Sequence, residues 1–176
     1  NQFVLFGINL ENSKPGVIYH ATGGNGAKVK HYLEAAYFAE QTKELSPDLI
    51  IISRGTNEAI EYPYVDPKFT EQLNAFLSQI RNQNPNAQFL LTTPPDFYKK
   101  KTRRNPGVEV VRDKIIEYAS ENNLAYWDLY TSAGGKHSAD IWKKNSLLQN
   151  DGIHFKKAGY ELQGSLLYEA LIKGFN

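Results

Sequence analysis

Short apolar runs alternate with longer amphipathic stretches along most of this sequence, and this alternation restricts the fold more than any other feature. The runs are rich in β-branched and aromatic side chains, as in strands buried on both faces, and they occupy residues 17–19, 48–52, 88–92 and 124–127. The amphipathic stretches carry apolar residues at a spacing near 3.6, as in helices, and they occupy residues 27–45, 67–82, 108–122 and 157–173. Strand and helix in repetition predict an α/β fold with three layers, α/β/α, around a mainly parallel, doubly wound sheet.

The first residues do not fit this pattern. Residues 3–6 have the composition of a strand, but only residues 7–16 separate them from the next apolar run. A parallel crossover needs about a dozen residues or more, so we expect an antiparallel strand or the tail of an upstream segment here. The chain begins at Asn1 and contains no Met, which indicates that Asn1 is not a translation start. We therefore divide the chain into an upstream tail, residues 1–14, and a main domain, residues 15–176.

Composition excludes several classes of protein. With 20 Lys and Arg against 19 Asp and Glu, the formal charge is +1, which argues against a dedicated nucleic-acid binder. No apolar run approaches the roughly 18 residues that a transmembrane helix needs. The absence of Cys excludes disulfides, thiolate metal sites and cysteine nucleophiles, and it agrees with an oxidising compartment. The one basic run, residues 99–104, is interpreted as a solvated surface loop, with contact to an anionic polymer as the alternative.

Candidate site residues follow the predicted strands, because ligand sites in such sheets form beyond the carboxyl ends of the strands. A glycine-rich loop at residues 22–28 opens a helix, where free backbone N–H groups favour negative charge. Gly55-Thr56-Asn57 follows the second run, and Asp151 precedes His154 by three residues before the last helix. A carboxylate beside a histidine can hold the ring's Nδ1–H and leave Nε2 free as a base.

Each of these motifs alone has an ordinary structural interpretation. The glycine loop matches neither a P-loop nor a dinucleotide-binding fingerprint, and it can be a simple turn. Asn57 can be a turn or cap residue, and Asp151 can cap a helix beside a surface histidine. It is the order and topology of the three motifs together that indicate a catalytic site.

In that order and topology, the motifs resemble those of the SGNH hydrolases, also called GDSL-type esterases. The resemblance implies that the Gly26 N–H and the Asn57 side chain are oxyanion donors, and that Asp151 and His154 are the acid and base of a catalytic triad. It covers roughly residues 15–173 and implies a flavodoxin-like sheet. Sequence segments such as Thr93-Pro94-Pro95-Asp96 are similar to those of one branch of the family, the secreted or periplasmic bacterial carbohydrate and peptidoglycan O-acetyl esterases.

The family's first block, Gly-Asp-Ser, which carries the nucleophile on the first strand, is absent. Gly7-Ile8-Asn9-Leu10 has a similar shape but carries Asn where the hydroxyl is needed. The resemblance therefore implies that the nucleophile and the first strand lie upstream, before an inserted β-rich domain, and that this chain is the C-terminal part of a longer enzyme. Ser132, after the fourth run, is the internal alternative as nucleophile.

The implied function is a serine-type ester hydrolase that removes O-acetyl or other short acyl groups from a carbohydrate or peptidoglycan. The expected partners are an acylated glycan and the upstream segment, without metal or organic cofactor, and the expected location is secreted or periplasmic. We expect Gly55, Tyr62 and Tyr64 to bind substrate, with the tyrosines stacking on a sugar ring or packing in the loop. An inactive glycan-binding or scaffold module and an O-acyltransferase that uses the same site are the alternatives.

Overall fold

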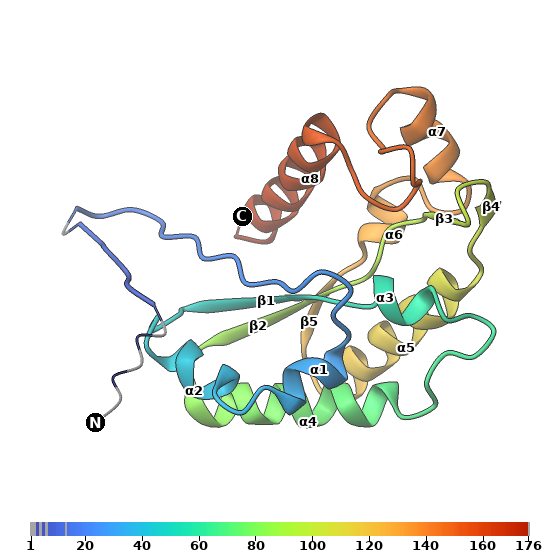
Figure 1. Ribbon diagram of the computed structural model, residues 1–176. Coiled ribbons are helices and arrows are strands. Elements are labelled where there is room, and N and C mark those ends of the chain that lie inside the picture. The colour runs from blue at the N-terminus through green and yellow to red at the C-terminus, as the bar shows by residue number, and fades with distance from the viewer. Residues whose placement is uncertain (1–2, 4, 6, 13, 176) are drawn as a thin grey trace.

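The computed structural model describes residues 3, 5, 7–12 and 14–175 (Figure 1). The strands in chain order are β1 Leu49–Ser53, β2 Gln88–Thr92, β3 Tyr98–Lys99, β4 Arg103–Arg104 and β5 Ala125–Trp127. The helices in chain order are α1 Val29–Glu34, α2 Phe38–Lys43, α3 Thr56–Ala59, α4 Phe69–Gln83, α5 Gly107–Glu121, α6 Leu129–Ser132, α7 Ser138–Lys144 and α8 Lys157–Phe175.

The central sheet has three parallel strands in the order β1-β2-β5. In β2, Phe89 and Leu91 face a core shared with α1, α4 and α5, whereas Leu90 faces the opposite side, where Leu166 of α8 packs. This period-two alternation with apolar residues on both faces is what a strand between two helical layers requires. Three of the four predicted strands and the parallel sheet are confirmed.

Helices cover both faces of the sheet, so the predicted three-layer α/β/α arrangement is confirmed. Figure 1 shows α1, α4 and α5 below the sheet and α8 above it. The core below contains fully buried side chains such as Phe69, Val108 and Val111. The predicted helices at residues 67–82, 108–122 and 157–173 correspond to α4, α5 and α8 within two residues at each end.

The predicted strand at residues 17–19 is wrong. These residues form neither a helix nor a strand, and the exposed fractions of Val17, Ile18 and Tyr19 are 97%, 55% and 82%. A strand exists only where a neighbour supplies its hydrogen bonds, and in the described part of the chain no strand pairs with these residues. The predicted strand at residues 3–6 includes positions 4 and 6, which lie outside the described residues.

The single helix predicted over residues 27–45 is also wrong, because two short helices, α1 and α2, form instead. The backbone leaves the helical region at Ala35, where φ is −79° and ψ is 97°. Tyr32, before the break, and Phe38, after it, meet edge to face at 4.9 Å, and both rings pack against Phe76 of α4. Burial of this aromatic trio outweighs the helical periodicity of the sequence.

The basic run forms the β3–β4 hairpin at the right of Figure 1, with Lys100 and Lys101 exposed at its turn. Within the described residues, no helix is long and apolar enough to cross a membrane.

Candidate active site

The glycine loop ends in a tight turn that leads into α1. Gly26 has φ +68°, a conformation that favours glycine, and the Ala27 N–H donates to the Gly24 carbonyl at 3.1 Å. The Gly24 N–H donates to the hydroxyl of Tyr32 at 2.8 Å, and the Tyr32 ring is buried in the core. The core thus fixes this loop through α1.

Asn57 lies in α3, directly after β1, and it connects this region to the glycine loop. Its Nδ2 donates to the carbonyl oxygen of Ala27, the residue after Gly26, at 3.0 Å. An amide group carries two N–H donors, so one remains for another acceptor. The structure therefore brings the Gly26 turn and the Asn57 side chain together, across 31 positions of sequence.

Gly55 shapes the turn from β1 into α3. It is buried with φ +114°, and a Cβ at this position would lie 2.8 Å from Val111 Cγ1 and 3.1 Å from Pro94 Cδ. Only glycine fits both the conformation and the space. Because Gly55 is enclosed, its contribution is to the shape of the turn that presents Asn57.

Glu58 is a site residue that the sequence analysis missed. Its carboxylate is 3% exposed and accepts hydrogen bonds from the Val29 N–H at 2.8 Å and the Gly55 N–H at 3.1 Å. The signal was available locally, since a Glu at the third position of a helix often reaches back to the N-cap N–H. The second partner, Val29, could not have been read from local spacing.

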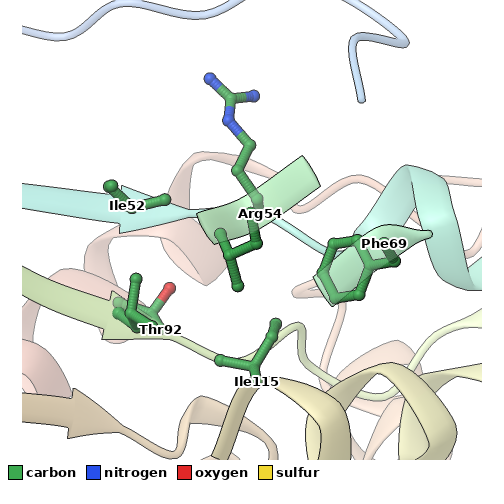
Figure 2. A pocket seen from close by; sticks show the side chains of 7 residues that line it. Ile52, Arg54, Phe69, Thr92 and Ile115 are labelled. Carbon is green, nitrogen blue, oxygen red and sulfur yellow. The ribbon is translucent and has the colours of Figure 1, made fainter. Parts of the chain in front are cut away.

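Arg54 is a second residue near the site that the sequence motifs do not identify. Figure 2 shows its side chain extending away from the apolar group of Ile52, Phe69 and Ile115. Its guanidinium carbon lies 4.0 Å from the centroid of the Tyr32 ring, a cation–π contact. Arg54 thereby ties the end of β1 to the tyrosine that holds the glycine loop.

Asp151 and His154 form a directly hydrogen-bonded pair in the connection between α7 and α8. His154 Nδ1 lies 2.7 Å from Asp151 Oδ2, while Asp151 Oδ1 accepts the N–H groups of Ile153 at 2.9 Å and His154 at 3.0 Å. The side chain of His154 is 52% exposed and that of Asp151 is 38% exposed. An acceptor at Nδ1 favours the tautomer in which Nε2 is free to take a proton.

The environment of Asp151 keeps its carboxyl ionised. Partial burial acts to raise its pKa, but the hydrogen bonds from the His154 ring and from the two backbone N–H groups outweigh burial, and the pKa lies below its ordinary value. The carboxylate is therefore charged at neutral pH and able to stabilise an imidazolium.

The loop that holds this pair is fixed to the segment after β2. The Tyr98 N–H donates to the Gly152 carbonyl at 2.9 Å, and a Cβ at Gly152, where φ is +73°, would lie 2.8 Å from Tyr98 Cδ2. The Gln149 N–H donates to the His154 carbonyl at 2.8 Å, and Leu148 bridges to Phe155. This connection and α3 both lie at the end of the sheet where β1 and β2 terminate (Figure 1).

The two predicted substrate-binding tyrosines follow α3 but differ in exposure. Tyr62 is half-buried, and its carbonyl accepts a hydrogen bond from Lys99 Nζ. Tyr64 is 85% exposed. Only Tyr64 presents a largely free ring.

Ser132, the internal alternative as nucleophile, is the last residue of α6. Its backbone N–H donates to the Asp128 carbonyl at 3.0 Å, and its side chain is exposed. Within the described residues, no hydrogen bond joins its hydroxyl to His154.

A second charged cluster surrounds Asp128, after β5. Arg112 donates to both carboxylate oxygens, and Thr93 Oγ1 donates at 2.9 Å. Burial acts to raise the pKa of Asp128, but Arg112, Thr131 and Thr93 outweigh burial and lower it to about 2.

No three His, Asp or Glu side chains of the described chain are grouped so as to hold a metal ion.

Known proteins are similar to this chain in sequence and in fold. The sequence model of the GDSL-like Lipase/Acylhydrolase family matches residues 7–162. A multidomain esterase of Ruminococcus flavefaciens is 26% identical over 97% of this chain, and the chain spans 21% of that protein. A solved peptidoglycan O-acetylesterase superposes with a TM-score of 0.76 at 23% identity, over 84% of this chain and 44% of the other. For an acetyl xylan esterase, the TM-score is 0.63 at 19% identity, over 82% and 76% of the two chains. This chain belongs to the GDSL-like lipase/acylhydrolase family.

Proposed function

We propose that residues 15–176 form the C-terminal portion of a serine-type esterase that removes O-acetyl groups from a carbohydrate or peptidoglycan. In this proposal, His154 is the general base, Asp151 orients it, and Gly26 and Asn57 stabilise the oxyanion. A segment outside residues 1–176 supplies the nucleophilic serine. The single observation that carries the proposal is the Asp151–His154 pair, joined at 2.7 Å through Nδ1, in a chain of this family.

The first step transfers a proton from the serine hydroxyl to His154 Nε2 as the serine oxygen bonds to the ester carbonyl carbon. The carbonyl oxygen becomes an oxyanion. His154 then gives the proton to the sugar oxygen as the carbon–oxygen bond of the ester breaks, which leaves an acyl-enzyme. In the second half-reaction, water attacks the acyl carbon while His154 Nε2 takes its proton. His154 then returns the proton to the serine oxygen as the acyl–serine bond breaks, which releases acetate and free serine. Asp151 stabilises the imidazolium formed in each half-reaction.

The oxyanion donors in this proposal are the Gly26 N–H, the second N–H of Asn57 and the N–H of the serine itself. The hydrogen bond from Asn57 to Ala27 supports this assignment, because it places the amide nitrogen beside the glycine turn. Donors held in place before the reaction stabilise the developing charge without reorganisation.

An external strand for the nucleophile is supported by surface that the described chain leaves uncovered. β1 is an edge strand, and Leu49 on it is 41% exposed. In the described chain β1 pairs with β2 on one side. An added strand would pair with its other edge.

A glycan substrate is supported by the open position of the site. The His154 ring is 52% exposed, so a polymer can approach it without entering a closed cavity. Tyr64, at 85% exposed, can stack on a sugar ring. The similar proteins named above as a peptidoglycan O-acetylesterase and an acetyl xylan esterase act on substrates of this class. Cell-wall glycans lie outside the cytoplasm, so we also propose a secreted or periplasmic location.

The test uses the protein extended upstream to include the proposed nucleophile segment, with acetate release measured from acetylated xylan and from O-acetylated peptidoglycan. We expect His154→Ala to lower kcat by at least about a thousandfold. His137→Ala is the matched control, because His137 also contacts an aspartate three residues away. An unchanged rate in His154→Ala would overturn the assignment. Acetyl transfer to an added acceptor glycan in place of water would instead support the acyltransferase alternative.

A further inference from the structure

We propose that Glu58 is a positioning residue that sets the distance between the two oxyanion donors, Gly26 and Asn57. The inference rests on the proposed function for the role of those donors. It goes beyond that function because Glu58 belongs to neither the triad nor the donor set.

The two carboxylate oxygens of Glu58 accept hydrogen bonds from two different loops and so form a bridge between them. Oε1 accepts the N–H of Val29, three residues after Gly26, at 2.8 Å. Oε2 accepts the N–H of Gly55, two residues before Asn57, at 3.1 Å. The bond from Asn57 Nδ2 to the Ala27 carbonyl, at 3.0 Å, joins the same two loops. If one loop shifts relative to the other, at least one of these bonds breaks.

Burial makes the bridge costly to break. Glu58 is 3% exposed and Val29 is 0% exposed, so water cannot replace a lost partner without local opening. Hydrogen bonds from backbone N–H groups to a buried carboxylate are stronger than neutral ones, and a buried carboxylate left with one partner is unfavourable. Val29 is the first residue of α1, and Gly55 is the N-cap of α3.

Catalysis would be sensitive to this bridge. An oxyanion donor acts when it lies about 2.7–3.1 Å from the developing charge, and a shift of about 1 Å can cost roughly 100-fold in rate. A residue that only stabilises the fold would change the fraction of folded protein. A positioning residue changes kcat in molecules that are fully folded.

A matched control lies on the same two loops. Glu61 pairs with Lys28, and its side chain is 39% exposed. The Lys28–Glu61 ion pair connects the same segments through two partly buried side chains, and this contact does not involve the N–H groups of Val29 and Gly55. Glu61→Gln therefore removes a charge and the ion pair with Lys28 but leaves the hydrogen bonds of Glu58 intact.

The first measurement needs no activity and uses the upstream-extended protein. Amide hydrogen exchange is followed at Val29 and Gly55 in the wild type, Glu58→Gln, Glu58→Ala and Glu61→Gln. We expect faster exchange at both amides in Glu58→Ala, at one or both in Glu58→Gln, and at neither in Glu61→Gln, with α4 amides unchanged in all. Wild-type protection at both amides of a folded Glu58→Ala protein would overturn the bridge.

The second measurement is steady-state acetate release by the upstream-extended enzyme. We expect kcat to fall about 10-fold in Glu58→Gln and about 100-fold in Glu58→Ala, with KM within about twofold and Glu61→Gln near wild type. A rise in KM with kcat unchanged would overturn the positioning role. If the wild-type extended enzyme releases no acetate, the proposed function and the catalytic role fail together, while the exchange result still decides the bridge.

Discussion

Asp151 Oδ2 lies 2.7 Å from His154 Nδ1, and Asp151 Oδ1 simultaneously accepts two backbone N–H groups of the same turn. One carboxylate thus closes the turn and orients the ring. The catalytic hypothesis depends on this double role of Asp151.

Asp151→Asn should lower kcat of the upstream-extended enzyme by about 10²- to 10⁴-fold. The amide can still accept from the backbone N–H groups, but it loses the charge that stabilises the imidazolium and can select the wrong tautomer. The measurement is kcat for nitrophenyl acetate across pH. Asp113→Asn is the control for loss of a carboxylate, because Asp113 pairs with Arg112 and is 68% exposed. Equal effects of the two substitutions would contradict the role of Asp151.

Asn57→Ala should lower kcat by about 10²- to 10³-fold with a small change in KM, because it removes an oxyanion donor that acts mainly in the transition state. It also removes the bond to the Ala27 carbonyl. Asn145→Ala is the control, since the exposed Asn145 side chain donates to the Ile141 carbonyl one turn earlier. If Asn57→Ala raised KM and left kcat alone, Asn57 would be a substrate-binding residue instead.

Gly55→Ala should destabilise the fold by roughly 2 kcal/mol or more. A Cβ would meet Val111 at 2.8 Å, and φ of +114° is strained for alanine. Gly164→Ala is the matched control: Gly164 lies within α8, and a Cβ there meets nothing within 4 Å. We expect that change to stabilise by about 0.5–1 kcal/mol. Denaturant unfolding of both variants measures the difference, and similar values for the two would contradict the structure at Gly55.

Asp128 should contribute to stability at neutral pH and lose that contribution in acid. Its pKa is lowered from 3.8 to about 2, because Arg112 and two threonines outweigh the effect of burial. A lowered pKa gives a contribution that is complete above about pH 4 and is lost as the pH falls to about 2. The size is on the order of 2 kcal/mol.

Asp128→Asn should therefore lower the free energy of unfolding at pH 7 and flatten its pH dependence between about pH 4 and 2. Asp113→Asn is the control, because Asp113 also pairs with Arg112 but is 68% exposed. Parallel pH profiles of the wild type and Asp128→Asn in acid would contradict the assignment.

The sequence predicts those parts of the fold whose cause is local or periodic. The strands β1 and β2 and the helices α4, α5 and α8 follow from apolar periodicity, and the Asp151–His154 pair follows from its three-residue spacing. The strand predicted at residues 17–19 is wrong because strand formation depends on a neighbour, which composition cannot show. The break between α1 and α2 depends on Phe76, a residue from α4.

The same limit applies to the site. Glu58 and Arg54 act through Val29 and Tyr32, which are 29 and 22 positions away in sequence. The family resemblance implies roles for Asn57 and His154, but contacts between distant segments determine which residues support them.

The most direct test of the account is labelling with a serine-reactive fluorophosphonate, followed by mass spectrometry to locate the modified residue. In the upstream-extended enzyme, we predict one rapidly labelled serine outside residues 1–176, with labelling abolished by His154→Ala. Residues 1–176 alone should neither be labelled nor hydrolyse nitrophenyl acetate. Rapid labelling at Ser132, together with activity that Ser132→Ala abolishes, would contradict the account.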